Sequence, residues 1–342
     1  MALLVTGGCG FIGSNYVRRV RRLRPEAALV NLDLLTYAGN LENVAELRDE
    51  PGYTFVRGDV ADAAVVERVL VEHGIDEIVH FAAESHVDRA ILGPAAFVRT
   101  NVLGTATLLE AARRIGVRRF VQVSTDEVYG ALGPDDPPFT EESPLRPRNP
   151  YSASKAAADH LALAYHHTYG FPVVVTRCGN NFGPYQFPEK LIPLLISNAL
   201  EDRPVPVYGD GLQVRDWIHV HDHCRGIESV REKGRLGVVY NIGARGESTN
   251  LELVRTVLRV LGKSESLIRF VEDRPGHDRR YAMDARRIGE ELGWRPEMRF
   301  EEALADTVRW YIDHRAWWEA VRSGAYLEYY DRQYGSRLCG DV

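Results

Sequence analysis

The sequence predicts an α/β protein with a doubly wound parallel sheet and a smaller mixed α/β domain. Through the first half of the chain, short apolar runs rich in β-branched residues alternate with longer amphipathic stretches. This alternation is typical of parallel strands joined by right-handed helical crossovers. After Arg177 the alternation ends and the segments become short and mixed. A chain of 342 residues is long enough for one large domain and a smaller companion.

The predicted strands of the large domain are apolar on both faces, as expected of strands buried in a parallel sheet. They are Leu3–Thr6, Leu29–Leu32, Thr54–Arg57, Ile78–Phe81, Phe120–Ser124 and Val173–Arg177. The helices predicted between them are Ile12–Leu23, Ala63–His73, Ala95–Ile115 and Ser152–Tyr169. The first helix should end where Arg24 meets Pro25, because a residue that precedes proline disfavours helical backbone angles.

Turn and cap signals organise the second half of the chain. Residues 179–188 predict a loop, and Asp210-Gly211 predicts the turn of a hairpin. Residues 249–252 (Thr-Asn-Leu-Glu) have the form of a capping box that begins a helix. The predicted segments are the hairpin strands Val205–Tyr208 and Val214–Ile218, the further strands Val238–Ile242 and Ile268–Val271, and helices near Leu191–Leu200, Asn250–Leu261, Ala285–Leu292 and Phe300–His314.

Charge and cysteine content restrict the partners and the compartment. The net charge is −6, and the basic run Arg18–Arg24 falls on a predicted helix, where its arginines should form a solvated face, so nucleic acid is not expected as a partner. The apolar run Met1–Val5 meets glycine at once and is too short for a signal or membrane-spanning segment. Four cysteines without metal-ligand spacing favour a reduced, cytoplasmic protein.

Three alternating histidines are weighed as a metal site. His219, His221 and His223 would share one face of a strand, as metal ligands do. Asp222, however, is expected to cap a helix that starts at His223, which would turn His223 away. No metal is therefore predicted.

A glycine-rich segment joins the first strand to the first helix. Gly7, Gly10 and Gly13 stand where a dinucleotide-binding turn needs glycine for the sharp turn, for the approach to the pyrophosphate and for helix packing. The helix that follows would present its free N–H groups to the pyrophosphate. Asp33 ends the second strand, and its carboxylate suits the adenosine ribose hydroxyls and would repel a 2′-phosphate. The sequence thus predicts a Rossmann-type domain that binds NAD rather than NADP.

A tyrosine and a lysine, Tyr151 and Lys155, lie four residues apart on one face of a predicted helix. A nearby ammonium and the positive nicotinamide ring would lower the pKa of the phenol, which is ordinarily too high for a base at neutral pH. With the glycine loop and Ser124-Thr125, this pair resembles the short-chain dehydrogenase/reductase superfamily in its extended, sugar-nucleotide branch. The resemblance implies that Tyr151 removes a hydroxyl proton during hydride transfer to NAD, and that Lys155 holds the nicotinamide ribose.

Two adjacent carboxyl groups, Asp126 and Glu127, follow Thr125, where the epimerases of this branch have no such pair. Mutual repulsion should raise the pKa of one of them. A ketone–alcohol interconversion has no use for the pair, whereas an elimination needs one protonated acid and one ionised base. The chain therefore resembles the dTDP-glucose 4,6-dehydratases, and further matching segments are residues 36–40, 82–89, 180–184, 187–191 and 273–281.

The resemblance implies a role for each catalytic residue. Tyr151, assisted by Thr125, takes the C4 hydroxyl proton while hydride from C4 reduces NAD. Glu127 removes the C5 proton, and Asp126 protonates the C6 hydroxyl, which leaves as water. The hydride returns to C6 and a proton is added back at C5. NAD is then tightly bound and recycled within each turnover, and dTDP-glucose becomes a 4-keto-6-deoxy sugar nucleotide.

The resemblance also implies the residues that contact the two ligands. Arg215 and Arg274 suit the diphosphate, because guanidinium groups are permanently charged and fork-shaped. The further cofactor residues are Phe11, Ile12, Leu34, Leu35, Thr36, Asp59, Val60, Phe81, Ala82, Ala83, Ser85, Thr100, Ser124 and Asn181. The further substrate residues are Ser85, Asp88, Thr125, Asn180, Glu189, Lys190, Leu191, Pro206, Tyr208, Asn250, Asp273, His277 and Tyr281. Individually, some have structural alternatives: Asp59 also fits a helix cap, and Asn250 lies in the capping box.

We expect residues 1–178 with about 214–243 to form the NAD-binding domain, about 179–213 with 244–325 the nucleotide-sugar domain, and 326–342 a tail. The resemblance also implies a homodimer through the helices predicted at Ala95–Ile115 and Ser152–Tyr169. Two departures from the family pattern are Leu34, where many relatives have lysine, and a short segment at 131–150. The competing functions are a nucleotide-sugar C4 epimerase and a non-catalytic NAD-binding scaffold.

Overall fold

The computed structural model describes residues 1–273 and 277–322, so the predicted contact Arg274 and the predicted tail 326–342 lie outside the described residues. A seven-stranded sheet forms the larger part, in the order β10-β6-β5-β4-β1-β2-β3, and every pair of neighbours is parallel. Its strands are β1 (Ala2–Thr6), β2 (Ala28–Asp33), β3 (Tyr53–Arg57), β4 (Glu77–His80), β5 (Arg119–Thr125), β6 (Val173–Cys178) and β10 (Val239–Ile242). This arrangement confirms the doubly wound fold and each predicted strand of the large domain.

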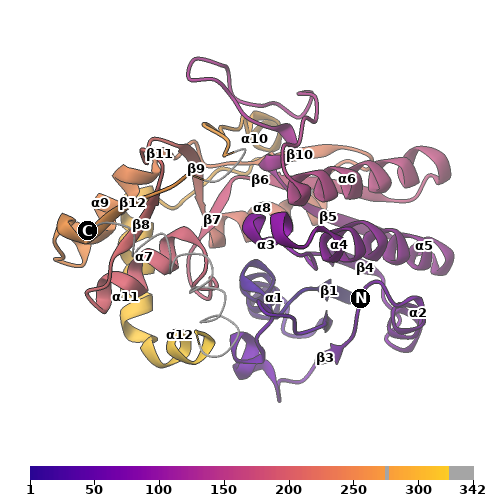
Figure 1. Ribbon diagram of the computed structural model, residues 1–342. Helices are drawn as coiled ribbons and strands as arrows, with labels where there is room; N and C mark the ends of the chain where they lie inside the picture. The colour runs from indigo at the N-terminus through magenta and orange to yellow at the C-terminus, as the bar shows by residue number, and fades with distance from the viewer. Residues whose placement is uncertain (274–276, 323–342) are drawn as a thin grey trace.

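Helices cover both faces of this sheet (Figure 1). One face packs on Tyr16 and Ile227, from α1 (Phe11–Leu23) and α8 (Val220–Lys233), together with α10 (Arg286–Leu292). The other face packs on α2 (Ala63–Glu72), α5 (Thr105–Ile115) and α6 (Pro150–Tyr169). Along the chain, shorter helical segments lie between these helices. They are η1 (Leu41–Leu47), α3 (Val87–Leu92), α4 (Pro94–Phe97), the π-helical η2 (Val98–Gly104) and η3 (Asp126–Tyr129).

The smaller part lies beside the large sheet, on the left in Figure 1. It contains a three-stranded sheet, in the order β11-β9-β7, and a two-stranded sheet that pairs β12 with β8. The core between these sheets and their helices includes Trp217, Leu253, Leu304 and Trp318. The strands are β7 (Asn180–Phe182), β8 (Val205–Tyr208), β9 (Val214–His219), β11 (Glu247–Thr249) and β12 (Ile268–Val271). The helices are α7 (Leu191–Leu200), α9 (Asn250–Val260), η4 (Glu265–Leu267), α11 (Phe300–Asp313) and α12 (Arg315–Val321).

The predicted hairpin is wrong. β8 and β9 belong to different sheets, because β8 pairs in parallel with β12 while β9 pairs with β7 and β11. The turn residues Gly209 and Gly211 do adopt positive φ, at 57° and 71°. A turn signal sets the local path of the chain, whereas the partner of each strand depends on segments far away in the sequence. The predicted loop at 179–188 likewise contains β7.

Of three predictions made for helices and their caps, one is confirmed and two are wrong. The capping box at Thr249 and Glu252 is confirmed, since each side chain accepts a hydrogen bond from the backbone N–H of the other. The single helix predicted over Ala95–Ile115 is instead α4, the π-helical η2 and α5 in succession. α8 begins at Val220 with His219 as its N-cap, so Asp222 is not the cap.

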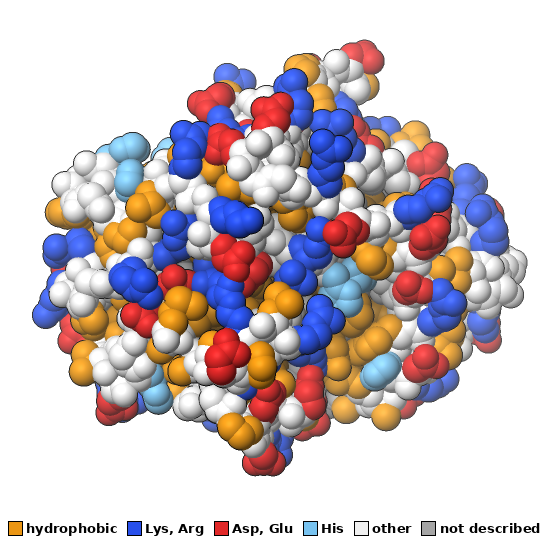
Figure 2. All heavy atoms as spheres, turned by 180° about the vertical axis from the view of Figure 1, so that it is seen from behind, with side chains coloured by type: hydrophobic (Ala, Val, Ile, Leu, Met, Phe, Trp, Pro, Cys, Tyr) orange, Lys and Arg blue, Asp and Glu red, His pale blue; other side chains and the backbone are white. Residues whose placement is uncertain are grey.

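The arginines of α1 do not all form a solvated face. Arg21 is buried, and its guanidinium donates to Glu50 and to three backbone carbonyls. Arg18 pairs with Glu46, and Arg24 with Glu228. Figure 2 shows basic and acidic side chains interleaved across the rear face of the molecule. Among the described residues, no helix is long and apolar enough to cross a membrane.

Candidate active site

The glycine loop follows β1, next to the point where the order of the strands reverses between β1 and β4. Ligands of open parallel sheets bind at the carboxyl ends of strands at such a point. Gly7 has φ of 71°, and a Cβ there would lie 2.7 Å from the backbone nitrogen of Ala82 on the next loop. A Cβ on Gly13 would lie 2.2 Å from the carbonyl oxygen of Gly7. Only glycine permits this packing, so the loop leaves the N-terminus of α1 open to a pyrophosphate.

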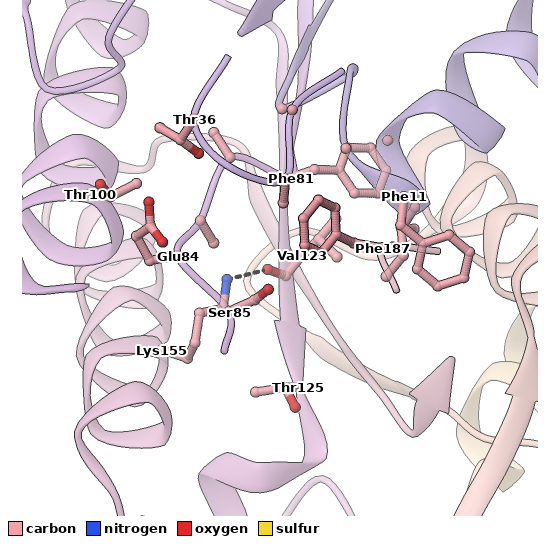
Figure 3. A pocket seen from close by; sticks show the side chains of 18 of the residues that line it. Phe11, Thr36, Phe81, Glu84, Ser85, Thr100, Val123, Thr125, Lys155 and Phe187 are labelled. Carbon is pink, nitrogen blue, oxygen red and sulfur yellow. Dashed lines mark hydrogen bonds between the residues drawn. The ribbon is translucent and has the colours of Figure 1, made fainter. Parts of the chain in front are cut away.

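A cavity extends from this loop to the end of β5 (Figure 3). Every predicted cofactor residue except Leu35 lines it. Leu35 instead packs against the core beside α1. Asp33 is buried at the cavity wall, where its carboxylate accepts hydrogen bonds from the backbone N–H groups of Cys9 at 2.9 Å and Leu35 at 2.8 Å. Each carboxylate oxygen keeps a second lone pair, so the residues present fit the adenosine end of NAD.

The five predicted catalytic residues lie together in the same cavity. Thr125 ends β5 and caps η3, because its hydroxyl accepts a hydrogen bond from the backbone N–H of Glu127. α6 begins at a capping box on Asn149 with Pro150 at its first turn. The Asn149 amide also lies 3.4 Å from a carboxylate oxygen of Glu127. The cap of the short η3 and the capping box of α6 therefore hold Tyr151 close to the carboxyl pair.

The two carboxyl groups have different environments. Asp126 is buried, at 2% exposed, whereas Glu127 is only half-buried. Burial raises the pKa of Asp126 well above its ordinary value, and the charges of Glu127 and Asp216 raise it further. The Thr125 hydroxyl donates to Oδ1 of Asp126 at 3.2 Å. The raised pKa favours the protonated form of Asp126, beside a more solvated carboxyl group, and an elimination needs one acid and one base.

From the protein's own groups alone, the pKa of Tyr151 is raised rather than lowered, and Lys155 is not among the groups that shift it. Burial raises that pKa well above its ordinary value, and the charge of Glu127 adds to the shift, while a hydrogen bond with Thr125 opposes it. Burial also lowers the pKa of the Lys155 ammonium, whose Nζ donates to the backbone carbonyl of Val123 at 2.7 Å (Figure 3). The reason is that both side chains are buried in the wall of the cavity, where loss of hydration disfavours the charged form of each.

A second cavity opens beside the first, and Glu127, Asn180 and Lys190 line both. Most predicted substrate residues line this second cavity, and Ser85 and Thr125 line the first. Asp273 lines neither; it accepts a hydrogen bond from the Gln213 amide at 3.0 Å. The predicted substrate residues in the second cavity are Asp88, Asn180, Glu189, Lys190, Leu191, Pro206, Tyr208, Arg215, Asn250, His277 and Tyr281.

The cations of the second cavity are held by neighbouring groups. The Arg215 guanidinium lies 4.5 Å from the centre of the Tyr281 ring and donates to the backbone carbonyl of Asp278 at 3.0 Å. Nζ of Lys190 donates to the backbone carbonyl of Ser85 at 2.9 Å. Glu189 is buried and pairs with Arg89 at 3.1 Å. The Arg215 guanidinium and the Lys190 ammonium thus line a cleft whose charge suits an anionic ligand.

Several lining residues were not predicted from the sequence. Glu84 and Phe187 line the first cavity, and they lie inside segments that match the family, so the resemblance could have found them. Cys178 and Trp217 line the first and second cavities and carry no local signal. Their positions depend on where β6 and β9 end in space, which no local pattern records.

The alternating histidines do not share a strand face. His219 ends β9, while His221 and His223 lie on α8. His223 is buried, and its Nδ1 lies 2.9 Å from the side-chain oxygen of Asn181. Within residues 1–273 and 277–322, no group of three His, Cys, Asp or Glu side chains is placed to hold a metal ion.

Comparison with known proteins agrees with this geometry. The family model described as GDP-mannose 4,6 dehydratase matches residues 4–307. The dTDP-glucose 4,6-dehydratase of Xanthomonas campestris pv. campestris (strain B100) is 52% identical over 341 residues, covering 94% of this chain and 96% of that protein.

Two solved structures extend the comparison. The dTDP-glucose 4,6-dehydratase of Streptomyces venezuelae, solved with NAD and TYD bound, has a TM-score of 0.91 and 53% identity, covering 94% of this chain and 100% of that one. The UDP-glucose 4-epimerase of Thermus thermophilus, in complex with NAD, has a TM-score of 0.84 and 32% identity, covering 92% of this chain and 100% of that one. The chain belongs to the GDP-mannose 4,6 dehydratase family and, within it, to the dTDP-glucose 4,6-dehydratases.

Proposed function

We propose that this protein converts dTDP-D-glucose to dTDP-4-keto-6-deoxy-D-glucose and water, as an NAD-dependent hydro-lyase. The observation that carries the proposal is the carboxyl pair: a buried Asp126 with a raised pKa next to a half-buried Glu127, both lining the cavity that Tyr151 lines. A C4 epimerase needs the tyrosine and the cofactor but has no use for an acid and a base at C6 and C5. The epimerase of Thermus thermophilus is also much less similar in sequence than the dehydratases are.

The chain's own residues divide the chemistry by their environments. NAD, when bound, accepts hydride from C4 and supplies it again at C6, so it is not consumed. Tyr151 takes the C4 hydroxyl proton, with Thr125 hydrogen-bonded to it. The new C4 ketone acidifies the C5 proton, which Glu127 removes. Asp126 gives its proton to the C6 hydroxyl, which departs as water. Glu127 then gives its proton back to C5, and the proton that Tyr151 took replaces, by way of solvent, the one that Asp126 lost, so the dehydration is balanced.

The second cavity is proposed to hold the nucleotide and the diphosphate. Arg215 and Lys190 stand in its wall and would offset the diphosphate charge. Asn180 and Glu189, which line both cavities, would then contact the sugar between the two ends. Arg274 and Asp273 remain proposed contacts on the strength of the family resemblance.

The test is incubation of the purified protein with dTDP-glucose. We expect a 4-keto product, seen by its strong absorbance in alkali, with no net accumulation of NADH. An epimerase would form dTDP-galactose without that absorbance, and a non-catalytic scaffold would leave the sugar unchanged. Either result would overturn the proposal.

Replacement of the acid should separate two leaving groups. Asp126→Asn should slow loss of water from C6 by about 10²–10⁴-fold, because a neutral amide cannot donate the proton that a leaving hydroxide needs. A 6-fluoro analogue of the substrate should be affected far less, since fluoride leaves without protonation. The measurement is the rate of product formation from both substrates. Equal losses on the two would count against Asp126 as the acid.

We further propose that the enzyme is a cytoplasmic homodimer and that its chain divides near residues 178, 213 and 243. The free cysteines Cys9, Cys178 and Cys224 are buried, which suits a reducing compartment.

Val98 and Leu103, beside α5, are 56% and 49% exposed, and such exposed apolar side chains favour a surface that a second copy of the chain covers. β10 and α8 join the large sheet, as this division requires, whereas β9 (Val214–His219) pairs with β7 and β11, so residues 214–219 belong with the smaller part. Light scattering of the purified protein would report twice the chain mass if the dimer forms.

A further inference from the structure

A pair of opposite charges, Asp159 and Arg177, is buried between β6 and the helix that carries Tyr151 and Lys155. Asp159 lies four residues after Lys155, so the two project from the same face of α6. Its Oδ2 accepts a hydrogen bond from Nε of Arg177, on β6, at 2.9 Å. Asp159 is 0% exposed and Arg177 is 3% exposed. Neither lines either of the two cavities, so neither is placed to touch the substrate or the cofactor.

The arginine of this pair is held on several sides. Nη1 of Arg177 donates to the Tyr129 hydroxyl at 3.0 Å, and that hydroxyl donates to the side-chain oxygen of Asn241 at 2.7 Å. The guanidinium also lies 4.8 Å from the centre of the Tyr129 ring. Oδ1 of Asp159, in contrast, is buried and has no hydrogen-bond partner in the described part of the chain. One oxygen of the carboxylate is thus tied to the arginine, and the charge of the carboxylate acts on Lys155 through space.

Few other groups near Lys155 carry a charge at neutral pH. His80, on β4, stays neutral, because burial and the charge of Lys155 lower its pKa to about 3. The Cys178 thiol, on β6, stays neutral because burial raises its pKa. Tyr151, Asp126 and Glu127 are the reacting groups themselves, and burial raises the pKa of Asp126 and Tyr151. Burial lowers the pKa of Lys155, and Asp159 is the charged side chain that opposes this shift.

We propose that Asp159 is a positioning residue for the oxidation at C4: its carboxylate keeps Lys155 in the charged form, and Arg177 holds that carboxylate in place. The inference rests on the proposed function, because Lys155 matters here as the cation next to the catalytic Tyr151. A buried ion pair that only supports the fold would predict something else. Loss of Asp159 or Arg177 would then lower the stability of the protein and the amount of NADH formed. It would not change the pH above which the rate of NADH formation falls.

The test is the pH profile of the first chemical step alone. dTDP-6-deoxyglucose has no C6 hydroxyl to eliminate, so its reaction should stop after C4 oxidation, and bound NADH can be followed by its near-ultraviolet absorbance. In Asp159→Asn, the alkaline limb of the NADH formation rate should move down by about 1–3 pH units, because Lys155 loses its proton at lower pH. Asp159→Glu should bring the limb back toward that of the unmodified protein. In Arg177→Met the limb should move up, since a neighbouring positive charge is lost and Lys155 is then the cation left beside Asp159.

Glu228→Gln is the matched control, because it removes another buried carboxylate from an ion pair with an arginine, Arg231 at 2.9 Å, on the opposite face of the sheet. Its alkaline limb should not move. An unshifted limb in Asp159→Asn, or a limb that stays in place or moves down in Arg177→Met, overturns the inference. If Asp159→Asn does not fold, the direction measured in Arg177→Met decides. An unmodified protein that forms no product from dTDP-glucose would instead overturn the proposed function.

Discussion

Glu127→Gln should lower turnover of dTDP-glucose by about 10²–10⁴-fold, the usual contribution of a positioned base. Glutamine keeps the size of the side chain, and its amide cannot accept the C5 proton. The oxidation at C4 does not need this base, because Tyr151 and Lys155 carry it. We therefore expect a variant that forms bound NADH on adding substrate and then stalls. Stopped-flow absorbance would follow NADH, and the alkaline assay would follow the 4-keto-6-deoxy product.

The control for this variant is Glu141→Gln, the same substitution at another partly buried carboxylate. Glu141 accepts a hydrogen bond from the backbone N–H of Asn241 at 2.9 Å and lines neither ligand cavity. Its turnover should stay close to that of the unmodified protein. Normal turnover in Glu127→Gln would remove Glu127 from the role of base. Loss of NADH formation together with product would show that Glu127 serves the oxidation step as well.

Gly13→Val should weaken NAD binding by roughly 10–100-fold or more and reduce dehydration in proportion. A Cβ at this position would lie 2.2 Å from the carbonyl oxygen of Gly7, a backbone atom that cannot rotate away. The loop must then open, and such overpacking costs about 1–3 kcal/mol. The N–H groups at the N-terminus of α1 would no longer point toward the pyrophosphate, so NAD would bind more weakly. The NAD content of the purified protein and calorimetric titration with NAD would measure the loss.

Gly289→Val controls for replacing a glycine by a branched residue in a helix. A Cβ on Gly289 would meet its nearest atom, the carbonyl oxygen of Trp294, at 3.4 Å, and α10 lies outside both cavities. This variant should bind NAD normally. Full NAD content in Gly13→Val would mean that the loop can relax around the side chain and that the close approach at Gly13 does not control the cofactor.

The local features of the site were predictable from the sequence because they depend on short spacings. The glycines at 7, 10 and 13 and Asp33 specify a turn and a strand end, and the structure brings them to one cavity. Tyr151 and Lys155 share a helix face because four residues make about one helical turn. The carboxyl pair needed only adjacency and a strand end. The sheet itself followed from short apolar runs, rich in β-branched residues, that alternate with amphipathic stretches.

Other features could not be read from spacing. The partner of β8 is β12, some sixty residues on, and a turn at Asp210-Gly211 cannot reveal this. Leu35 was expected at the cofactor, but its partly buried side chain packs against the core and does not line the cavity, because the side that a loop residue faces depends on its neighbours in space. The ion pair of Asp159 and Arg177 joins α6 to β6 and has no local pattern either.

The sequence by itself determined the fold class and the cofactor loop, because each depends on residue type at short range, and the proposed acid, base and tyrosine came from the family resemblance. Only the tertiary structure decided how the environments of the two carboxyl groups differ and that burial lowers the pKa of Lys155. Asp126 and Glu127 are neighbours with the same chemistry, and the difference between them comes from burial and from Asp216, which lies far away in the sequence. Desolvation and long-range charge are properties of packed atoms, so they exist only once the chain has folded.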